Sequence, residues 1–191
     1  RLYVARYKLA ALHRATLRDP LTGLANRAGL ADAWAQLVAL RPWVVVVDLD
    51  GFKPVNDTHG HAAGDLVLTA VAERLRRVHG VAARLGGDEF AALLLDPNPA
   101  AAARQLAAAI AAPVRLPCGV AVSVTASIGL APASPTGLAA ALADADAAMY
   151  RAKTTGAGVV AFDPLRDDHA TAEPRPTFRV RDLTPSLGVG R

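Results

Sequence analysis

Near its middle the chain carries the sequence Arg84-Leu85-Gly86-Gly87-Asp88-Glu89-Phe90, with short apolar runs on both sides, at 81–83 and 90–95. Two such runs joined through a glycine pair predict a β-hairpin, because glycine tolerates the positive φ of tight turns. Two carboxylates follow the glycines directly, and the missing side chains leave room for a large charged group. Metal and phosphate chemistry fits this pattern, although a solvated hairpin would account for the same residues if they stood alone.

A second acidic pair follows the most apolar stretch of the chain. Residues 43–49 predict a strand buried on both faces, and this strand ends in Asp48-Leu49-Asp50. Both carboxylates lie on one face of the strand. An unpaired buried carboxylate is costly, so a divalent cation is expected if Asp88 lies near. The alternative is that both carboxylates reach water at the end of the strand.

Residues 51–65 are rich in side-chain donors and acceptors and are interpreted as a loop. Lys53 offers a point charge for a phosphate, and Asn56 and Asp65 offer hydrogen bonds to the edge of a base. Turn and helix-capping roles are the alternatives, above all for Asp65, which precedes an apolar stretch. Zinc is not expected, because the two histidines here lack a usual ligand spacing.

The remaining pattern predicts helices alternating with strands. Residues 1–18 have heptad spacing, which leaves a coiled-coil end and a helix packed on its own domain equally favoured. Residues 163–191 are polar and rich in proline, and a disordered tail is predicted there. The other expected elements are helices at 27–40, 67–78, 100–112 and 138–153, and strands at 120–130 and 159–162.

Composition limits the class of protein. The 191 residues suit one domain with appendages, and the net charge of +4 comes from scattered arginines, which favours a solvated surface over a nucleic-acid face. The longest apolar run is too short to span a membrane. A single cysteine, Cys118, suits a reducing cytoplasm. The chain begins with arginine, so an upstream sensory or membrane domain is expected to be missing.

Five blocks, in order, carry a resemblance to a known family. They are Asp19 to Arg27, Asp48 to Asp65, Arg84 to Phe90, Ser127-Ile128-Gly129, and Ala145 to Lys153. Over residues 16–162 the chain resembles the GGDEF family, the diguanylate cyclases of bacterial signalling. The resemblance implies an α+β, cyclase-like fold with a central, mainly antiparallel sheet flanked by helices, as domain 19–162 between a short N-terminal signalling helix (1–18) and the tail.

The resemblance also implies roles for individual residues. Mg²⁺, with Mn²⁺ as a substitute, is expected on Asp48, Asp88 and the Leu49 carbonyl. Glu89 is expected as a further metal ligand or a proton acceptor, and Asn56 and Asp65 as readers of guanine. The residues expected to hold or admit the triphosphate are Gly51, Phe52, Lys53, Gly86, Gly87 and Lys153. The catalytic residues are expected to be Asp88, Glu89 and Lys53.

The implied reaction joins two GTP molecules held by two domains that meet face to face, giving cyclic di-GMP and two pyrophosphates. The alternative is a degenerate domain that binds GTP or cyclic di-GMP without turnover. A cyclase making a different cyclic nucleotide is disfavoured by Asp65. Two departures from the family pattern matter. Residues 77–80 lack the Asp of an Arg-x-x-Asp inhibitory site, and Ala157 replaces a phosphate-binding Arg, which is expected to weaken GTP binding by ~1.5–3 kcal/mol.

Overall fold

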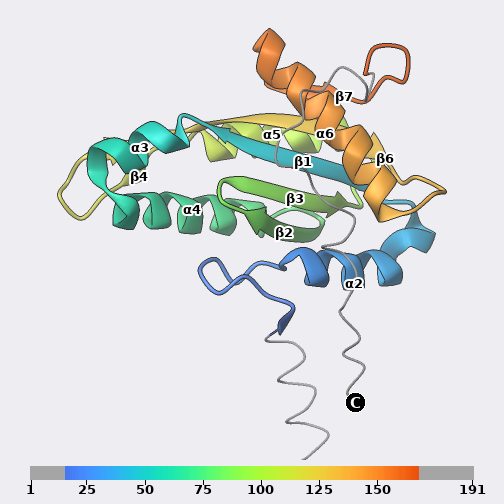
Figure 1. The fold of residues 1–191 in the computed structure, drawn as a ribbon, viewed down its shortest axis with the longest axis horizontal. Helices are drawn as coiled ribbons and strands as arrows, with labels where there is room; N and C mark the ends of the chain where they lie inside the picture. Colours follow the sequence, from blue (N-terminus) through green and yellow to red (C-terminus); the bar gives the residue numbers. More distant parts are fainter. Residues whose placement is uncertain (1–15, 168–191) are drawn as a thin grey trace, which may run out of the picture.

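The computed structural model describes residues 16–167, which form an α+β domain with one five-stranded sheet between two layers of helices (Figure 1). The strand order is β2-β3-β1-β6-β7, and every pair is antiparallel except β6 with β7. This confirms the predicted fold class. The sheet strands are β1 (Trp43–Asp50), β2 (Gly80–Gly86), β3 (Glu89–Leu94), β6 (Thr125–Pro132) and β7 (Val159–Ala161). The helices are α2 (Arg27–Leu37), η1 (Val38–Leu40), α3 (Phe52–His59), α4 (His61–Leu75), α5 (Pro99–Ile110) and α6 (Leu138–Thr155).

The central strand β1 divides the core in two. Val45 and Val47 pack in one cluster with residues of α4 and α5, whereas Val44 and Val46 pack in a second cluster with residues of α2 and α6. Successive side chains of a strand point to opposite faces. The acidic residues that end β1 therefore lie on the same face as Val44 and Val46, toward α2 and α6.

The expected hairpin is present as β2 and β3. The register pairs Arg84 with Phe90 and Gly86 with Glu89. Gly86 and Gly87 have φ values of 149° and 51°, so the turn uses backbone angles that favour glycine. The prediction made from the apolar runs is confirmed, including the position of the turn.

The loop predicted over residues 51–65 is wrong. Gly51, with φ of 81°, turns the chain out of β1, and α3 and α4 follow at once, separated by Gly60. Pro54 lies in the first turn of α3, where proline needs no hydrogen-bond partner for its nitrogen. Only Phe52 and Val55 of α3 are buried. The sequence of α3 therefore has too few apolar residues to show a helical periodicity. Asp65 lies inside α4, which rules out its role as a helix cap.

The single strand predicted over residues 120–130 is divided. Its first part is β5 (Ala121–Val122), which pairs with β4 (Val114–Arg115) in a small separate sheet. Pairing with β1 starts only at Thr125, opposite Asp50, because β1 ends there and the chain enters α3. The inward side chains from Val122 to Ile128 nevertheless share one core, as the alternation predicts, while Val120 is exposed.

Both ends of the chain extend outside the described residues. The predicted N-terminal helix lies almost wholly in residues 1–15, and most of the predicted tail lies in residues 168–191, so neither is described. Residues 163–167 form a turn in which Asp167 is buried and pairs with Arg151 at 2.6 Å. This part of the predicted tail therefore belongs to the folded domain.

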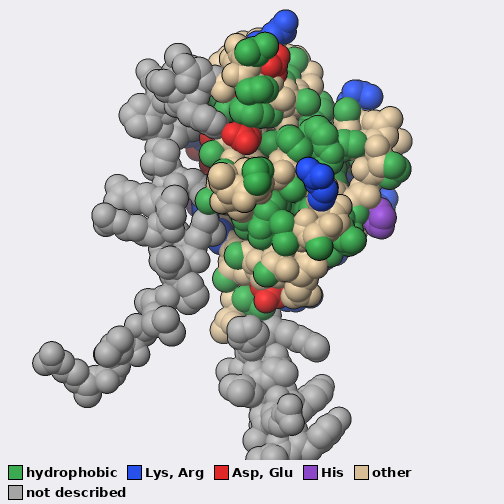
Figure 2. Space-filling model, turned by 90° about the vertical axis from the view of Figure 1, so that its right-hand side faces the viewer, with side chains coloured by type: hydrophobic (Ala, Val, Ile, Leu, Met, Phe, Trp, Pro, Cys, Tyr) green, Lys and Arg blue, Asp and Glu red, His purple; other side chains and the backbone are tan. Residues whose placement is uncertain are grey.

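The helices between residues 16 and 167 pack around the sheet, and none of them combines the length and hydrophobicity needed to cross a bilayer. The end of the molecule at the right of Figure 1 shows hydrophobic side chains interspersed with a few charged ones (Figure 2).

Candidate functional site

The two acidic motifs meet across neighbouring strands. Asp48 of β1 lies directly opposite Glu89 of β3, and the Leu49 amide donates to the Asp88 carbonyl at 3.3 Å. Asp48 itself is only 7% exposed. The antiparallel pairing of β1 with β3 thus joins residues about forty positions apart in the sequence. The proximity of Asp48 and Asp88, which the sequence leaves conditional, follows directly from this register.

The positively charged side chain of Lys153 contacts Asp48 and lies near Asp50. The Lys153 ammonium, in the last turn of α6, lies 2.5 Å from Asp48 Oδ1 and 3.9 Å from Asp50 Oδ1. The Asp50 carboxylate also accepts hydrogen bonds from Ser127 Oγ at 3.1 Å and from Thr125 Oγ1 at 3.4 Å. The sequence predicts Lys153 at the triphosphate and not at Asp48. It does not reveal the two hydroxyl donors, because only the pairing of β6 with β1 brings them to Asp50.

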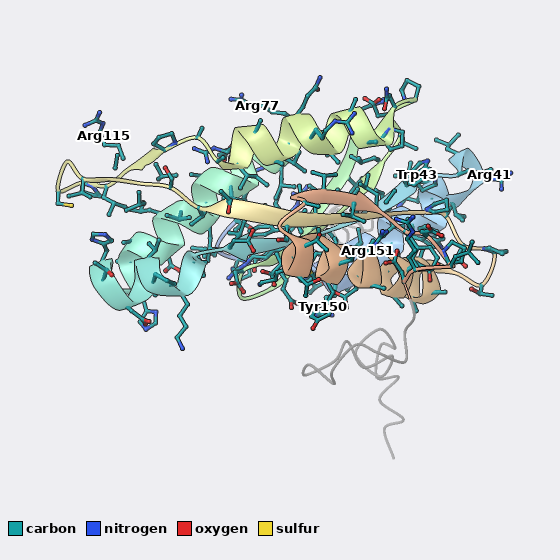
Figure 3. All side chains as sticks on the ribbon, turned by 90° about the horizontal axis from the view of Figure 1, so that it is seen from above. Arg41, Trp43, Arg77, Arg115, Tyr150 and Arg151 are labelled. Atoms are coloured by element: carbon teal, nitrogen blue, oxygen red, sulfur yellow. The ribbon has the colours of Figure 1, made fainter. Side chains whose placement is uncertain are left out.

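Glu89 lies in a crowded acidic environment. Burial raises the pKa of the Glu89 carboxyl, and the negative charges of Asp146, Asp48 and Asp88 raise it further, while the guanidinium of Arg27 opposes them. Asp146 is a residue that sequence reasoning did not assign to the site. It lies on α6 seven residues before Lys153, and this spacing on one helical face is the signal that could have found it. Figure 3 shows Tyr150 of the same helix and its neighbour Arg151.

Two arginines, Arg27 and Arg84, hold the hairpin that carries Asp88 in position. Arg27 Nε, at the start of α2, donates to the Leu85 carbonyl at 2.8 Å. Arg84 donates to the Gly87 carbonyl at 2.8 Å and forms an ion pair with Asp19 at 3.3 Å. Burial alone would raise the pKa of Asp19, but hydrogen bonds from Thr22 and the charge of Arg84 lower it below its ordinary value. The N-terminal turn thus holds the hairpin in position.

The residues expected to bind nucleotide follow β1 directly. The backbone amides of Gly51 and Phe52 lie at the start of α3, where helix N-terminal amides favour phosphate, and Lys53 is exposed beside them. The Asn56 side chain lies against Gly64 so closely that a Cβ on this glycine would come within 2.0 Å of Asn56 Oδ1. Asn56 therefore lies beside Gly64, which directly precedes Asp65, an exposed residue of α4.

The proposed site residues form two groups joined by Gly51. One group, at the carboxyl end of β1, contains Asp48, Leu49, Asp88, Glu89 and Lys153; the other, along α3 and α4, contains Lys53, Asn56 and Asp65. A hollow of about 410 Å³ lies elsewhere, between α2, the N-terminal turn and β2, and none of these residues lines it.

The carboxylates suit a hard divalent cation. Within residues 16–167, no three His, Cys, Asp or Glu side chains are placed to hold a metal by themselves. Mg²⁺ does not need such a cage, because it is usually bound by one or two carboxylates together with substrate phosphates and water. The oxygen donors of Asp48 and Asp88 fit this requirement. Burial raises the pKa of Glu89, and the nearby carboxylates raise it further; a bound cation would oppose this second effect.

Comparisons with known proteins identify the family and the fold. The family model described as diguanylate cyclase, GGDEF domain, matches residues 16–158. An uncharacterised 19.3 kDa protein of Streptomyces ambofaciens is 46% identical over 144 residues, which are 71% of this chain and 78% of that protein. The diguanylate cyclase TpbB of Pseudomonas aeruginosa is 40% identical over 86% of this chain, but the match spans only 41% of TpbB.

Solved structures show the same fold. The coiled coil and GGDEF domain of DgcB from Caulobacter crescentus, in complex with c-di-GMP, gives a TM-score of 0.73 at 29% identity and covers 84% of this chain and 93% of that one. The GGDEF domain of TpbB gives a TM-score of 0.65 at 39% identity, over 76% of this chain and 94% of that one.

Proposed function

The chain belongs to the GGDEF family, and from this we propose that it is a diguanylate cyclase, condensing two GTP molecules into cyclic di-GMP and two pyrophosphates. In this proposal two copies of the domain face each other, each holding one GTP, and each 3′-hydroxyl attacks the α-phosphate of the other nucleotide. The observation that carries the proposal is the register of β1 with β3, which brings Asp48 beside Glu89 and next to Asp88.

We assign the carboxylates to the reacting phosphate. Asp48, Asp88 and the Leu49 carbonyl would hold Mg²⁺, which when bound neutralises phosphate charge and lowers the pKa of the attacking hydroxyl. Burial and the surrounding carboxylates raise the pKa of Glu89 above its ordinary value, which suits a residue that accepts a proton during the reaction. The turn at Gly86 and Gly87 would leave room for the nucleotide, since no atom of residues 16–167 beyond the immediate chain neighbours lies within 4 Å of a Cβ built at either position.

We assign the remaining residues to substrate recognition. Lys53 and the amides of Gly51 and Phe52 would hold the outer phosphates, joined by Lys153 once it leaves Asp48. Asn56 and Asp65 would read guanine, because a carboxylate that accepts from guanine N1 and N2 excludes adenine, which lacks this pair of donors. This assignment disfavours a cyclase for a different nucleotide.

A second candidate function is a module that binds GTP or cyclic di-GMP without turnover. Ala157 favours it, because a family phosphate ligand is missing there. The intact Gly86-to-Phe90 sequence and the paired carboxylates favour the enzyme.

Product analysis separates the two candidates. The chain is fused to a dimeric coiled coil, so that failure to dimerise does not hide activity, and incubated with GTP and Mg²⁺ beside the Asp88→Ala variant. The cyclase predicts cyclic di-GMP from the parent and none from the variant. Unconsumed GTP at high protein concentration, together with measurable GTP binding, would establish the binding module instead.

A further inference from the structure

Lys153 and a divalent cation compete for the same oxygen. The ammonium lies 2.5 Å from Asp48 Oδ1, and Asp48 is the carboxylate assigned to metal binding. Mg²⁺ requires its oxygen ligands at about 2.0–2.1 Å. An ammonium and Mg²⁺ held by one oxygen would repel each other strongly at such short separations. The ammonium therefore has to leave Asp48 before that oxygen coordinates the metal.

Asp50 offers the displaced ammonium a nearby partner. Its Oδ1 lies 3.9 Å from the same Lys153 nitrogen, on the same face of β1 as Asp48. Ser127 Oγ and Thr125 Oγ1 donate to the Asp50 carboxylate and hold it in place. The Lys153 side chain is 38% exposed, near the end of α6, so its long aliphatic stem has room to move.

We propose that Asp50 is a positioning residue for Lys153, which blocks the metal position on Asp48 until a divalent cation displaces its ammonium toward Asp50. The inference rests on the proposed function, because the competing cation is the one that the cyclase reaction uses. Lys153 then has two successive roles: it neutralises Asp48 before metal binding, and it is available to the triphosphate afterwards. Asp50 keeps the ammonium within reach of the nucleotide between these two states.

Binding of Mn²⁺ alone, without nucleotide, tests the competition. Free Mn²⁺ is measured by electron paramagnetic resonance in titrations of the wild type and Lys153→Met. The variant is expected to bind Mn²⁺ about fivefold more tightly, because the metal no longer displaces a partly exposed ion pair. Lys53→Met is the matched control: no ion pair of Lys53 is found among residues 16–167, so its affinity for Mn²⁺ should stay within about twofold of wild type. A Lys153→Met variant that binds no more tightly than wild type overturns the proposal.

A double-mutant cycle tests the role of Asp50. Asp50→Asn removes a negative charge and weakens Mn²⁺ binding in any background. In the wild type it also removes the second partner of the ammonium, so its effect should exceed its effect in Lys153→Met by about threefold or more. Equal effects in the two backgrounds would overturn the positioning role.

Two further measurements distinguish failure of the competition from misfolding and from failure of the proposed function. Thermal unfolding checks that each variant is folded, and Lys153→Gln replaces Lys153→Met if the latter is not. A wild type that makes cyclic di-GMP while its Lys153 variants bind Mn²⁺ no more tightly overturns the competition but leaves the proposed function intact. Absence of both Mn²⁺ binding and turnover in all versions overturns both.

Discussion

The pKa of the Glu89 carboxyl depends on its surroundings. It lies opposite Asp48 in the register of β1 with β3, and burial with three nearby carboxylates raises its pKa. A folded-state pKa above the unfolded value means that the folded state binds the proton more tightly. The carboxyl's contribution to stability is therefore complete below its ordinary pKa of about 4.5 and is lost as the pH rises through the raised value.

The Glu89→Gln variant should therefore be more stable than wild type at pH 7. The expected gain is about 0.5 kcal/mol, kept small because solvent screens a partly exposed carboxylate. The gain should shrink toward zero as the pH falls below 4.5. Urea unfolding at pH 4 and pH 7 checks this, with Asp146→Asn as a partner variant that should act in the same direction. An equal difference at the two pH values would contradict the raised pKa.

Ala157 stands where the family pattern has an arginine. It lies four positions after Lys153, on the exposed surface just beyond α6, and its amide donates to the Ala152 carbonyl. Its φ is not positive, so a larger side chain meets no backbone strain.

Ala157→Arg should restore a charge-assisted phosphate contact and tighten GTP binding by ~1.5–3 kcal/mol, which is at least tenfold. Thr155→Arg adds the same charge to the same exposed end of α6 and serves as the control. Equilibrium binding of a fluorescent GTP analogue measures both. If the two arginine variants bind equally, position 157 does not face the triphosphate.

Among the helices and strands, two glycines allow close packing: Gly64 between α3 and α4, and Gly129 between α6 and the sheet. A Cβ at Gly64 would lie 2.0 Å from Asn56 Oδ1 and 3.2 Å from Phe52 Cζ, both side-chain atoms, whereas a Cβ at Gly129 of β6 would lie 2.0 Å from the Ala145 carbonyl oxygen of α6. A side-chain tip can turn away, but the backbone of a packed helix cannot. The two glycines therefore have different functions in the structure.

Gly64→Ala should weaken GTP binding about tenfold or more by displacing Asn56, with little loss of stability, since alanine favours the helix by about 0.5–1 kcal/mol. Gly129→Ala should instead destabilise the domain by several kcal/mol, as overpacked core substitutions do. Thermal unfolding and GTP affinity of both variants check this. A Gly64→Ala variant that binds GTP like wild type would mean that Asn56 does not contact the nucleotide.

The elements differ in how far the sequence predicts them. Apolar runs identify β1 and the hairpin, because the burial of these strands leaves a clear hydrophobic signal. The sequence does not reveal the helix α3, because only two of its residues are buried. The contact of Lys153 with Asp48 could not be predicted, since it depends on where the end of α6 crosses β1. The hydrogen bonds that the hydroxyls of Thr125 and Ser127 donate to Asp50 depend in the same way on the register of β6 with β1.

Across the domain as a whole, the prediction that no second product site exists concerns the junction of α4 with β2. Gly80 occupies the position of the missing Asp in the Arg-x-x-Asp pattern. Its φ is 143°, and a Cβ there would lie 1.8 Å from the Leu93 carbonyl oxygen. An aspartate cannot replace it without a shift of the strand. The departure from the family pattern is thus built into the pairing of β2 with β3.

Cyclic di-GMP should therefore inhibit this chain only by competing with GTP, and Arg77→Ala should leave that inhibition unchanged. Initial rates at several GTP concentrations, with calorimetry of cyclic di-GMP binding, check both statements. Inhibition that persists at saturating GTP and disappears in Arg77→Ala would show a second product site after all.

We propose that Asp48 and Asp88, brought together by β1 and β3, act as one unit on a nucleotide. This is tested by kcat/KM for GTP in the dimerised chain, compared among wild type, Asp48→Asn, Asp88→Asn and the double variant. We predict that each single change lowers kcat/KM by about a hundredfold or more and that the double variant is hardly worse, as for residues that work together. Near-wild-type turnover in either single variant would show that the two carboxylates do not act together in the reaction.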